Sequence, residues 1–304
     1  MTTTSSASRP ASRAERVKAF IRAVAADFGH GELLTYASAI GFRVLFAIIP
    51  LGLFAIALIG FLGLEPAWTF ELAPSVHATL GDPLFAVVDV SVRQVLTSRQ
   101  GFWLTLGLAL TVWELSSAVR ATAGAFERIY NFRDERPFMR YIGVTILLGM
   151  AVGTCFLVAV FAIFFGAPVA EWLFGPGTVA TVVGFVARWV IALAAMLLAV
   201  GLLLRFAPGE RVDWRWVGTG AVVTVLVWAL ASAGFAGYVS YVVNYGSTFG
   251  SLAIPFVILL YLYLAALAFL FGVWVERRER TGCDRPIASP PDESEEGGEE
   301  DGED

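Results

Sequence analysis

Glu114 is the residue in this sequence whose type and position most clearly point to chemistry. It lies near the middle of an apolar stretch, residues 102–119, where a charged side chain costs roughly 2.5–3.5 kcal/mol to insert into hydrocarbon. A carboxyl there must be protonated, paired or in contact with water. It can serve as a proton or cation site on a solute path, or as a polar strut bonded to a neighbouring helix, and both interpretations stay open.

Arg188 lies within a second long apolar stretch, residues 178–204. If a helix begins near Thr178, Arg188 is the natural counter-charge of Glu114. If the helix begins at Trp189 instead, Arg188 marks the outer headgroup level, where arginine is common. We slightly favour the second interpretation.

Three further arginines adjoin the apolar stretches. Arg43 and Arg120 lie near the predicted inner ends of two helices, from which long side chains can extend to the headgroups. Alternatively, Arg43, Arg120 and Arg128 converge on one inner-facing basic pocket. Such a pocket would suit a phosphate or carboxylate ligand.

Two prolines, Pro50 and Pro255, interrupt the first and the sixth apolar stretch. A proline in a membrane helix releases a backbone carbonyl, and helices broken in this way often line cavities or hinges. Prolines are also common in membrane helices in general, so the ordinary interpretation needs no site.

Six apolar stretches must position these residues, and each is about as long as a bilayer is thick. A helix needs roughly 20 apolar residues to span the hydrocarbon core. The chain of 304 residues is 57% hydrophobic, too apolar for a soluble domain. The sequence therefore predicts an all-α fold, a polytopic membrane bundle of six transmembrane helices. The stretches are residues 44–63, 102–119, 141–166, 178–204, 216–238 and 252–275.

Basic residues lie on alternate sides of successive stretches. Four groups of arginines precede the first stretch, follow the second, follow the fourth and follow the sixth, whereas the opposite connections hold only Arg93 and Arg99. Cytoplasmic loops carry an excess of Lys and Arg, so this pattern predicts that both termini are cytoplasmic. The expected location is a prokaryotic cytoplasmic membrane.

The chain divides into three predicted segments. Residues 1–33 form a cytoplasmic segment with a basic amphipathic helix at the membrane interface, residues 34–276 form the six-span domain, and residues 277–304 form a disordered acidic tail. In the outer connection, Asp82 and Pro83 predict the start of a short amphipathic helix that runs through residues 84–96.

No enzyme signature is visible. The two histidines, His30 and His77, are 47 positions apart and on opposite predicted sides of the membrane, and no zinc cluster, Walker A loop or GxSxG elbow is present. We therefore expect no cofactor and no bound metal. Transport by such a chain would be passive or driven by an ion gradient.

Four stretches together resemble the YihY/BrkB family of six-span inner-membrane proteins. They are LLTYASAIGFRVLFAIIPL, VRATAGAFERIYNFRDERPFMR, WRWVGTGAVVTVLVWALASAGFAGYVSYV and YGSTFGSLAIPFVILLYLYLAALAFLFGVWVE. The resemblance covers roughly residues 27–276, and the block 129–137 is its most specific part. Glu127 stands where the family commonly has asparagine, and the ending at Glu276 departs from the family pattern by two inserted residues.

The resemblance implies an integral membrane protein for which transport has been proposed. A ribonuclease label has also circulated for the family, and this sequence gives it no support. The leading hypothesis is an ATP-independent transporter or flippase-like protein for an amphipathic or anionic envelope solute. The alternative is a non-transporting scaffold that recruits envelope proteins. Expected partners are membrane lipids and an anionic lipid or small solute, without nucleic acid; spanning bundles also often form homo-oligomers.

Overall fold

Helices make up almost all of the protein in this computed structural model. It describes residues 13–29, 32–63, 65–80, 82–97, 100–132, 134–175, 177–209, 214–242 and 253–281. Six of the helices in these ranges are long and apolar enough to cross a membrane, which confirms the expected all-α fold with six spans. They are α2 (Glu32–Phe61), α6 (Gln100–Tyr130), α7 (Phe138–Phe174), α8 (Thr178–Phe206), α9 (Trp214–Val242) and α10 (Ala253–Thr281).

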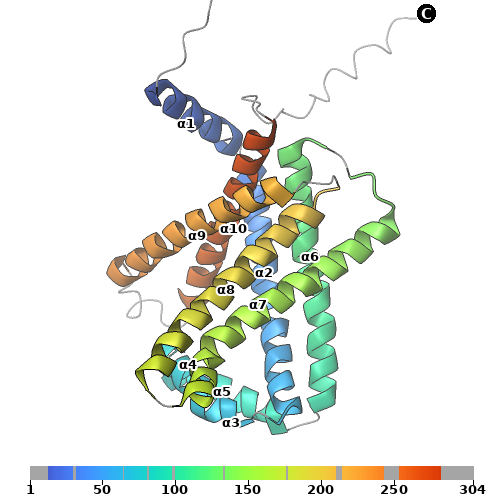
Figure 1. Cartoon of the computed structure of the whole chain (residues 1–304). Helices are drawn as coiled ribbons and strands as arrows, with labels where there is room; N and C mark the ends of the chain where they lie inside the picture. Colours follow the sequence, from blue (N-terminus) through green and yellow to red (C-terminus); the bar gives the residue numbers. More distant parts are fainter. Residues whose placement is uncertain are drawn as a thin grey trace, which may run out of the picture.

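The long helices include two antiparallel pairs, which meet where α6 packs against α7. Helix α2 packs along α6 and α7 along α8, while α10 contacts both α2 and α9 (Figure 1). The C-terminal ends of α6, α8 and α10 and the helix α1 (Arg13–Gly29) lie at one end of the bundle, here called the basic end. The opposite end is here called the cap end. The basic connections therefore gather on one side, and its cytoplasmic orientation stays a prediction.

Helix α1 packs against α10 at the basic end. Phe20 and Phe28 contact the Trp274 ring, and the Trp274 indole N–H donates a 2.7 Å hydrogen bond to the buried carboxylate of Asp27. The helix expected here is present, but part of its apolar face covers protein rather than lipid. Ile21 of the same face remains exposed. Of the predicted acidic tail, residues 277–304, the first five residues continue α10 and are not disordered, and residues 282–304 lie outside the described residues.

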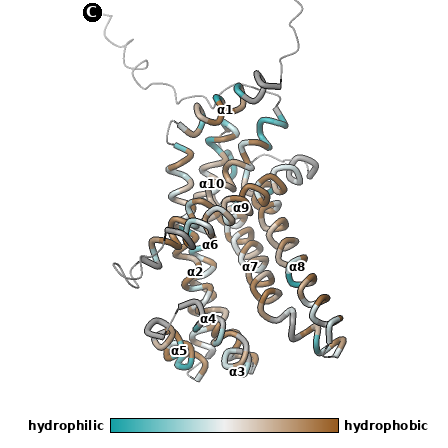
Figure 2. The backbone as a smooth tube through the Cα atoms, turned by 90° about the vertical axis from the view of Figure 1, so that its left-hand side faces the viewer, coloured by the Kyte–Doolittle hydropathy of each residue, from teal (hydrophilic) through white to brown (hydrophobic). Residues whose placement is uncertain are grey.

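At the cap end, short helices lie beneath α2 and α6 (Figure 2). The amphipathic helix expected after Asp82 is present as α5 (Asp82–Thr97), and it buries Val92, Val95 and Leu96. Trp68 packs beside them and donates a 2.9 Å hydrogen bond to the Asp89 carboxylate. The sequence analysis did not predict the three preceding elements, α3 (Glu65–Ala67), a π-helical turn (Trp68–Leu72) and α4 (Ala73–Leu80).

The expected interruptions at the two prolines are absent. Helix α2 continues through Pro50, which is buried inside it, because its neighbours α6 and α10 hold the helix on both sides of the missing hydrogen bond. Pro255 is the third residue of α10, in the first turn, where backbone N–H groups have no partner within the helix. Neither proline breaks a span.

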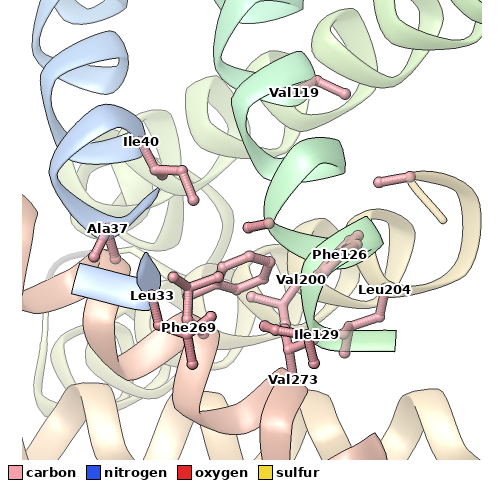
Figure 3. Packing of buried hydrophobic residues seen from close by; sticks show 14 of the residues in the cluster. Leu33, Ala37, Ile40, Val119, Phe126, Ile129, Val200, Leu204, Phe269 and Val273 are labelled. Carbon is pink, nitrogen blue, oxygen red and sulfur yellow. The ribbon is translucent and has the colours of Figure 1, made fainter. Parts of the chain in front are cut away.

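Side chains from α2, α6, α8 and α10 converge in a buried cluster towards the basic end (Figure 3). Leu33, Phe126, Leu204 and Val273 are each no more than 1% exposed there. Nearer the middle, α6 and α7 approach so closely that a Cβ on Gly149 would lie 3.0 Å from the backbone nitrogen of Ser116. Small residues allow such contacts between membrane helices.

This close contact makes a prediction for Gly149→Leu. The side chain would force α7 away from α6, and overpacking of this kind costs roughly 1–3 kcal/mol. Gly143→Leu on the same helix is the matched control, since nothing lies within 4 Å of its Cβ position. Thermal unfolding in detergent should show a lower midpoint for Gly149→Leu only. Equal midpoints for the two variants would contradict the close packing.

Candidate functional site

Arg43 of α2 and Arg120 of α6 donate hydrogen bonds to the same hydroxyl. The distances from Arg43 Nη1 and Arg120 Nη2 to the Ser117 Oγ are 3.3 and 2.9 Å. No carboxylate among the described residues forms an ion pair with either guanidinium. Two positive charges therefore share one neutral acceptor, which leaves most of their donor capacity for an anion.

Both arginines lie farther from the helix ends than the sequence indicated. Arg43 is eleven residues after the start of α2, and Arg120 is ten residues before the end of α6. At 1.5 Å per residue, each lies about 15 Å along its helix from the basic end. Both helices extend beyond their apolar stretches as partly polar helix, which is why the apolar boundary was a poor guide to the helix end.

Arg120 also lines a groove between α6 and α7. The groove has a volume of about 370 Å³, and its wall is mostly apolar and aromatic, with Trp113, Phe138 and Tyr141 among the lining residues. Ser116 and Arg120 are polar lining residues, and Tyr141 and Trp113 add a hydroxyl and an indole N–H. The groove therefore presents apolar surface with a cation beside it.

A second cavity lies inside the bundle. Its volume is about 340 Å³, and side chains from all six long helices line it. Thr122 and Thr224 are the only lining residues with a hydroxyl, and the Thr224 Oγ1 is buried without a hydrogen-bond partner among the described residues. An apolar cavity of this size can hold part of an acyl chain, and it leaves the helices room to shift.

Glu114 lies on the side of α6 that follows α2. In this antiparallel pair Ser117 meets Arg43 and Gly107 meets Phe54, so the same register puts Glu114 level with Phe46. Pro50 leaves the carbonyl of Phe46 without its usual backbone donor. The side chain of Glu114 is partly exposed, and in the described ranges it has neither a hydrogen bond nor an ion pair.

Arg188 is the eleventh residue of α8. Helix α8 begins at Thr178, so a start at Trp189 is wrong, because the residues before Arg188 continue the same helix against α7. The Arg188 guanidinium stands over the Phe185 ring at 4.8 Å, and its Nε atom is buried with no acceptor in the described part of the chain. No bond joins Arg188 to Glu114 there.

Arg128 does not join the other two arginines. Its guanidinium forms an ion pair with the carboxylate of Glu32, which ties the end of α6 to the start of α2. The structure therefore brings together Arg43 and Arg120 and gives Arg128 a separate partner. The expectation of one pocket with three arginines is wrong at Arg128.

The sequence analysis missed a fully buried carboxyl at the basic end. Glu276 of α10 is 0% exposed, and the Tyr130 hydroxyl donates a hydrogen bond to its Oε2 atom. The only sequence signal was that Glu276 is the first charged residue after the long uncharged stretch 216–275. That position had the appearance of an ordinary helix end.

Arg136 fastens the α6–α7 connection to the end of α8. Its guanidinium binds the Asp134 carboxylate and donates to the carbonyl oxygens of Phe206 and Ala207, at 3.3 and 2.8 Å. A cation is favourable at the C-terminus of a helix. Burial opposes ionisation of Asp134, but the hydrogen bonds from Arg136 outweigh it and lower the pKa of this carboxyl.

These features define a multi-pass α-helical protein of the cell membrane. No group of three His, Cys, Asp or Glu side chains in the described ranges could hold a metal ion. The chain belongs to the family described as Virulence factor BrkB, whose model matches residues 24–290, and this confirms the resemblance drawn from its four stretches.

Named relatives are distant in sequence. A ribonuclease-like protein, YfkH, of Bacillus subtilis strain 168 is 25% identical over 231 residues, 75% of this chain and 83% of YfkH. The UPF0761 membrane protein Smlt0865 of Stenotrophomonas maltophilia is 24% identical over 251 residues, 79% of this chain and 56% of that protein. The chain thus spans little more than half of Smlt0865. No solved structure matches it significantly.

The geometry at Arg136 predicts that Arg136→Gln destabilises the fold. The change leaves Asp134, only 7% exposed at its side chain, without its counter-charge, and such losses cost roughly 3–5 kcal/mol when fully buried. Arg140→Gln is the control, since Arg140 is exposed and surface changes stay within about 0.5 kcal/mol. Thermal unfolding in detergent measures both variants.

The pH dependence follows from the same pair. The pKa of Asp134 is lower in the folded protein than in the unfolded chain. The ionised Asp134 therefore contributes its full share of the folding stability above the ordinary aspartate pKa of about 3.9, and this stability is lost as the pH falls through the folded pKa. Asp134→Asn should therefore be less stable than the parent protein at pH 7, and the difference should shrink towards pH 3. A constant difference would contradict this assignment.

Proposed function

We propose that this protein is an ATP-independent transporter or flippase-like protein for an amphipathic, anionic solute of the cell envelope. The convergence of Arg43 and Arg120 on Ser117 is the observation that carries the proposal. Two guanidiniums within the spans are expensive without a counter-charge. An anionic headgroup would supply that charge and accept several of their N–H groups.

The surroundings of the arginines match an amphiphile. The α6–α7 groove begins at Arg120 and continues along aromatic and aliphatic side chains, so an apolar chain can lie there while its headgroup contacts the arginines. The central cavity gives the helices unfilled volume on the other side of α6. Movement of the solute across the bilayer needs such room, because tightly packed helices cannot rearrange.

The orientation belongs to this proposal. The basic end carries the arginines of both connections and of the end of α10, so the positive-inside rule puts it in the cytoplasm. The solute would then meet Arg43 and Arg120 from the cytoplasmic half of the membrane. With no ATP-binding loop visible in the sequence, movement follows a gradient.

Binding can be tested by native mass spectrometry of the full chain, purified in mild detergent and exchanged into phosphatidylglycerol. Arg43→Gln and Arg120→Gln should each bind this anionic lipid about ten- to hundredfold more weakly, as expected for a lost hydrogen bond to a charged group. Arg140→Gln, outside the groove, should bind normally.

The same measurement distinguishes a transporter from the alternative, a non-transporting scaffold. A scaffold would retain protein partners and only bulk lipid, with no difference among the three variants. Unchanged lipid binding in Arg43→Gln and Arg120→Gln would therefore rule out the headgroup site.

Glu114 makes a separate prediction for transport. If its carboxyl exchanges a proton or binds a cation on the solute path, Glu114→Gln should abolish movement of a fluorescent anionic lipid in proteoliposomes while the unfolding midpoint stays the same. The amide keeps the shape and hydrogen-bonding capacity of the neutral acid, so a purely structural strut would tolerate the change. Normal transport in this variant would remove Glu114 from the path.

A further inference from the structure

The carboxyl of Glu276 lies in an enclosure formed by four helices. Tyr130 of α6 bonds its Oε2 atom, and Gly220 of α9 approaches so closely that a Cβ there would lie 2.9 Å from the Cβ of Glu276. The same Gly220 position also contacts Leu204 of α8. The Oε1 atom of Glu276 is buried and has no hydrogen-bond partner among the described residues.

An ionised carboxylate does not suit this enclosure. A buried charge needs hydrogen bonds to both oxygens and a close counter-charge, and the described side chains provide one donor. A neutral carboxyl suits it better, since Oε2 can accept from Tyr130 while Oε1 carries the proton. The geometry therefore matches a protonated glutamic acid.

The charged groups around Glu276 lie mainly on its own helix. Arg280 and Glu279 act on it electrostatically, and the Arg280 guanidinium stands over the Tyr130 ring at 5.1 Å, while Arg277 also acts on Tyr130. From the other helices come Tyr130, Gly220 and Leu204, of which only Tyr130 is titratable. Asp27 of α1 is bonded to the neighbouring Trp274.

Glu276 lies on the basic-end side of the side chains that close the central cavity. Thr122 and Phe269 line the cavity, and Phe126 and Val273 lie one helical turn closer to the basic end, where each is 0% exposed. Ile129 and Leu204 complete this apolar plug (Figure 3). The hydrogen bond between Tyr130 and Glu276 then joins α6 to α10 directly behind the plug.

We propose that Glu276 is a proton-binding site that controls the opening of the central cavity at the basic end. In the closed state seen here Glu276 holds a proton and stays bonded to Tyr130. Opening passes that proton to water at the basic end, and the carboxylate left behind becomes hydrated as α6 and α10 separate. This inference rests on the proposed transport in one respect only: the proton bound by Glu276 would be the coupling ion of that transport.

Infrared spectroscopy of the full chain in lipid nanodiscs tests the proton itself. At pH 7 the protein should show the stretching band of a protonated carboxyl, and Glu276→Gln should remove it. Glu279→Gln is the matched control, since Glu279 is exposed one turn further along the same helix, and this variant should keep the band. Glu114→Gln identifies any contribution from Glu114, another carboxyl within the spans. A band that Glu276→Gln leaves unchanged would overturn the proposal.

Thiol labelling tests the control of opening. Thr122→Cys, in a background with Cys155 and Cys283 replaced by alanine, reports on the cavity, and Arg140→Cys reports the intrinsic rate at an exposed site. The labelling rate of the Thr122→Cys variant with a charged thiol reagent is divided by the rate of the Arg140→Cys variant. This ratio should rise by up to about tenfold for each unit of increasing pH, because opening releases one proton. With Glu276→Gln added, this rise should disappear. The same rise in both backgrounds would refute the control by Glu276.

Tyr130→Phe is an independent variant should Glu276→Gln fail to fold. It removes the hydroxyl that bonds Oε2, so the carboxyl band should shift in frequency, and an unshifted band would place the proton elsewhere. Neither measurement uses transport or lipid binding. If Glu276 is neutral but the arginines bind no anionic lipid, the proposed function is refuted and the proton site stands. If the arginines bind anionic lipid but Glu276 is ionised, the proposed function stands and the proton site is refuted.

Discussion

The hydrocarbon interior of a bilayer contains no water to solvate a polar group, and most features of this structure follow from that constraint. The backbone N–H and C=O groups form their hydrogen bonds within long helices. Thr105, Ser116 and Thr122 use their hydroxyls to bond carbonyls of their own helix. The groups left over are few, and they include Arg43, Arg120, Glu114 and Glu276. An ionisable side chain is costly in an apolar environment, so these residues are the first candidates for a functional role.

The two ends of the bundle and its middle are built differently. At the basic end, Arg136 holds the end of α8, Trp274 holds α1, and the Tyr130–Glu276 hydrogen bond joins α6 to α10. Polar links and the best-packed apolar side chains coincide there. The middle contains the apolar cavity and the arginine pair instead. The bundle is therefore tied by polar links at the basic end and has its unfilled volume in the middle.

The most specific block of the family resemblance, residues 129–137, has a structural explanation. Ile129 is fully buried, Tyr130 bonds Glu276, and the pair of Asp134 and Arg136 ties the connection to α8. Tyr130 thereby links α6 to α10, and Arg136 links the α6–α7 connection to the end of α8. The block that most resembles the family thus contains residues that hold the basic end together.

The sequence by itself determined the class of protein, the six spans and the helix at α5, because apolar length and periodicity are local properties of a chain. It could not determine which polar side chains meet. Arg43 and Ser117 are 74 positions apart, and Tyr130 and Glu276 are 146 apart, so only the packing of the helices brings them together. Helix ends were also misjudged, since α2 and α6 continue as partly polar helix where neighbouring helices cover them. Tertiary structure decided the site because long-range contacts, rather than local pattern, give a buried charge its partner.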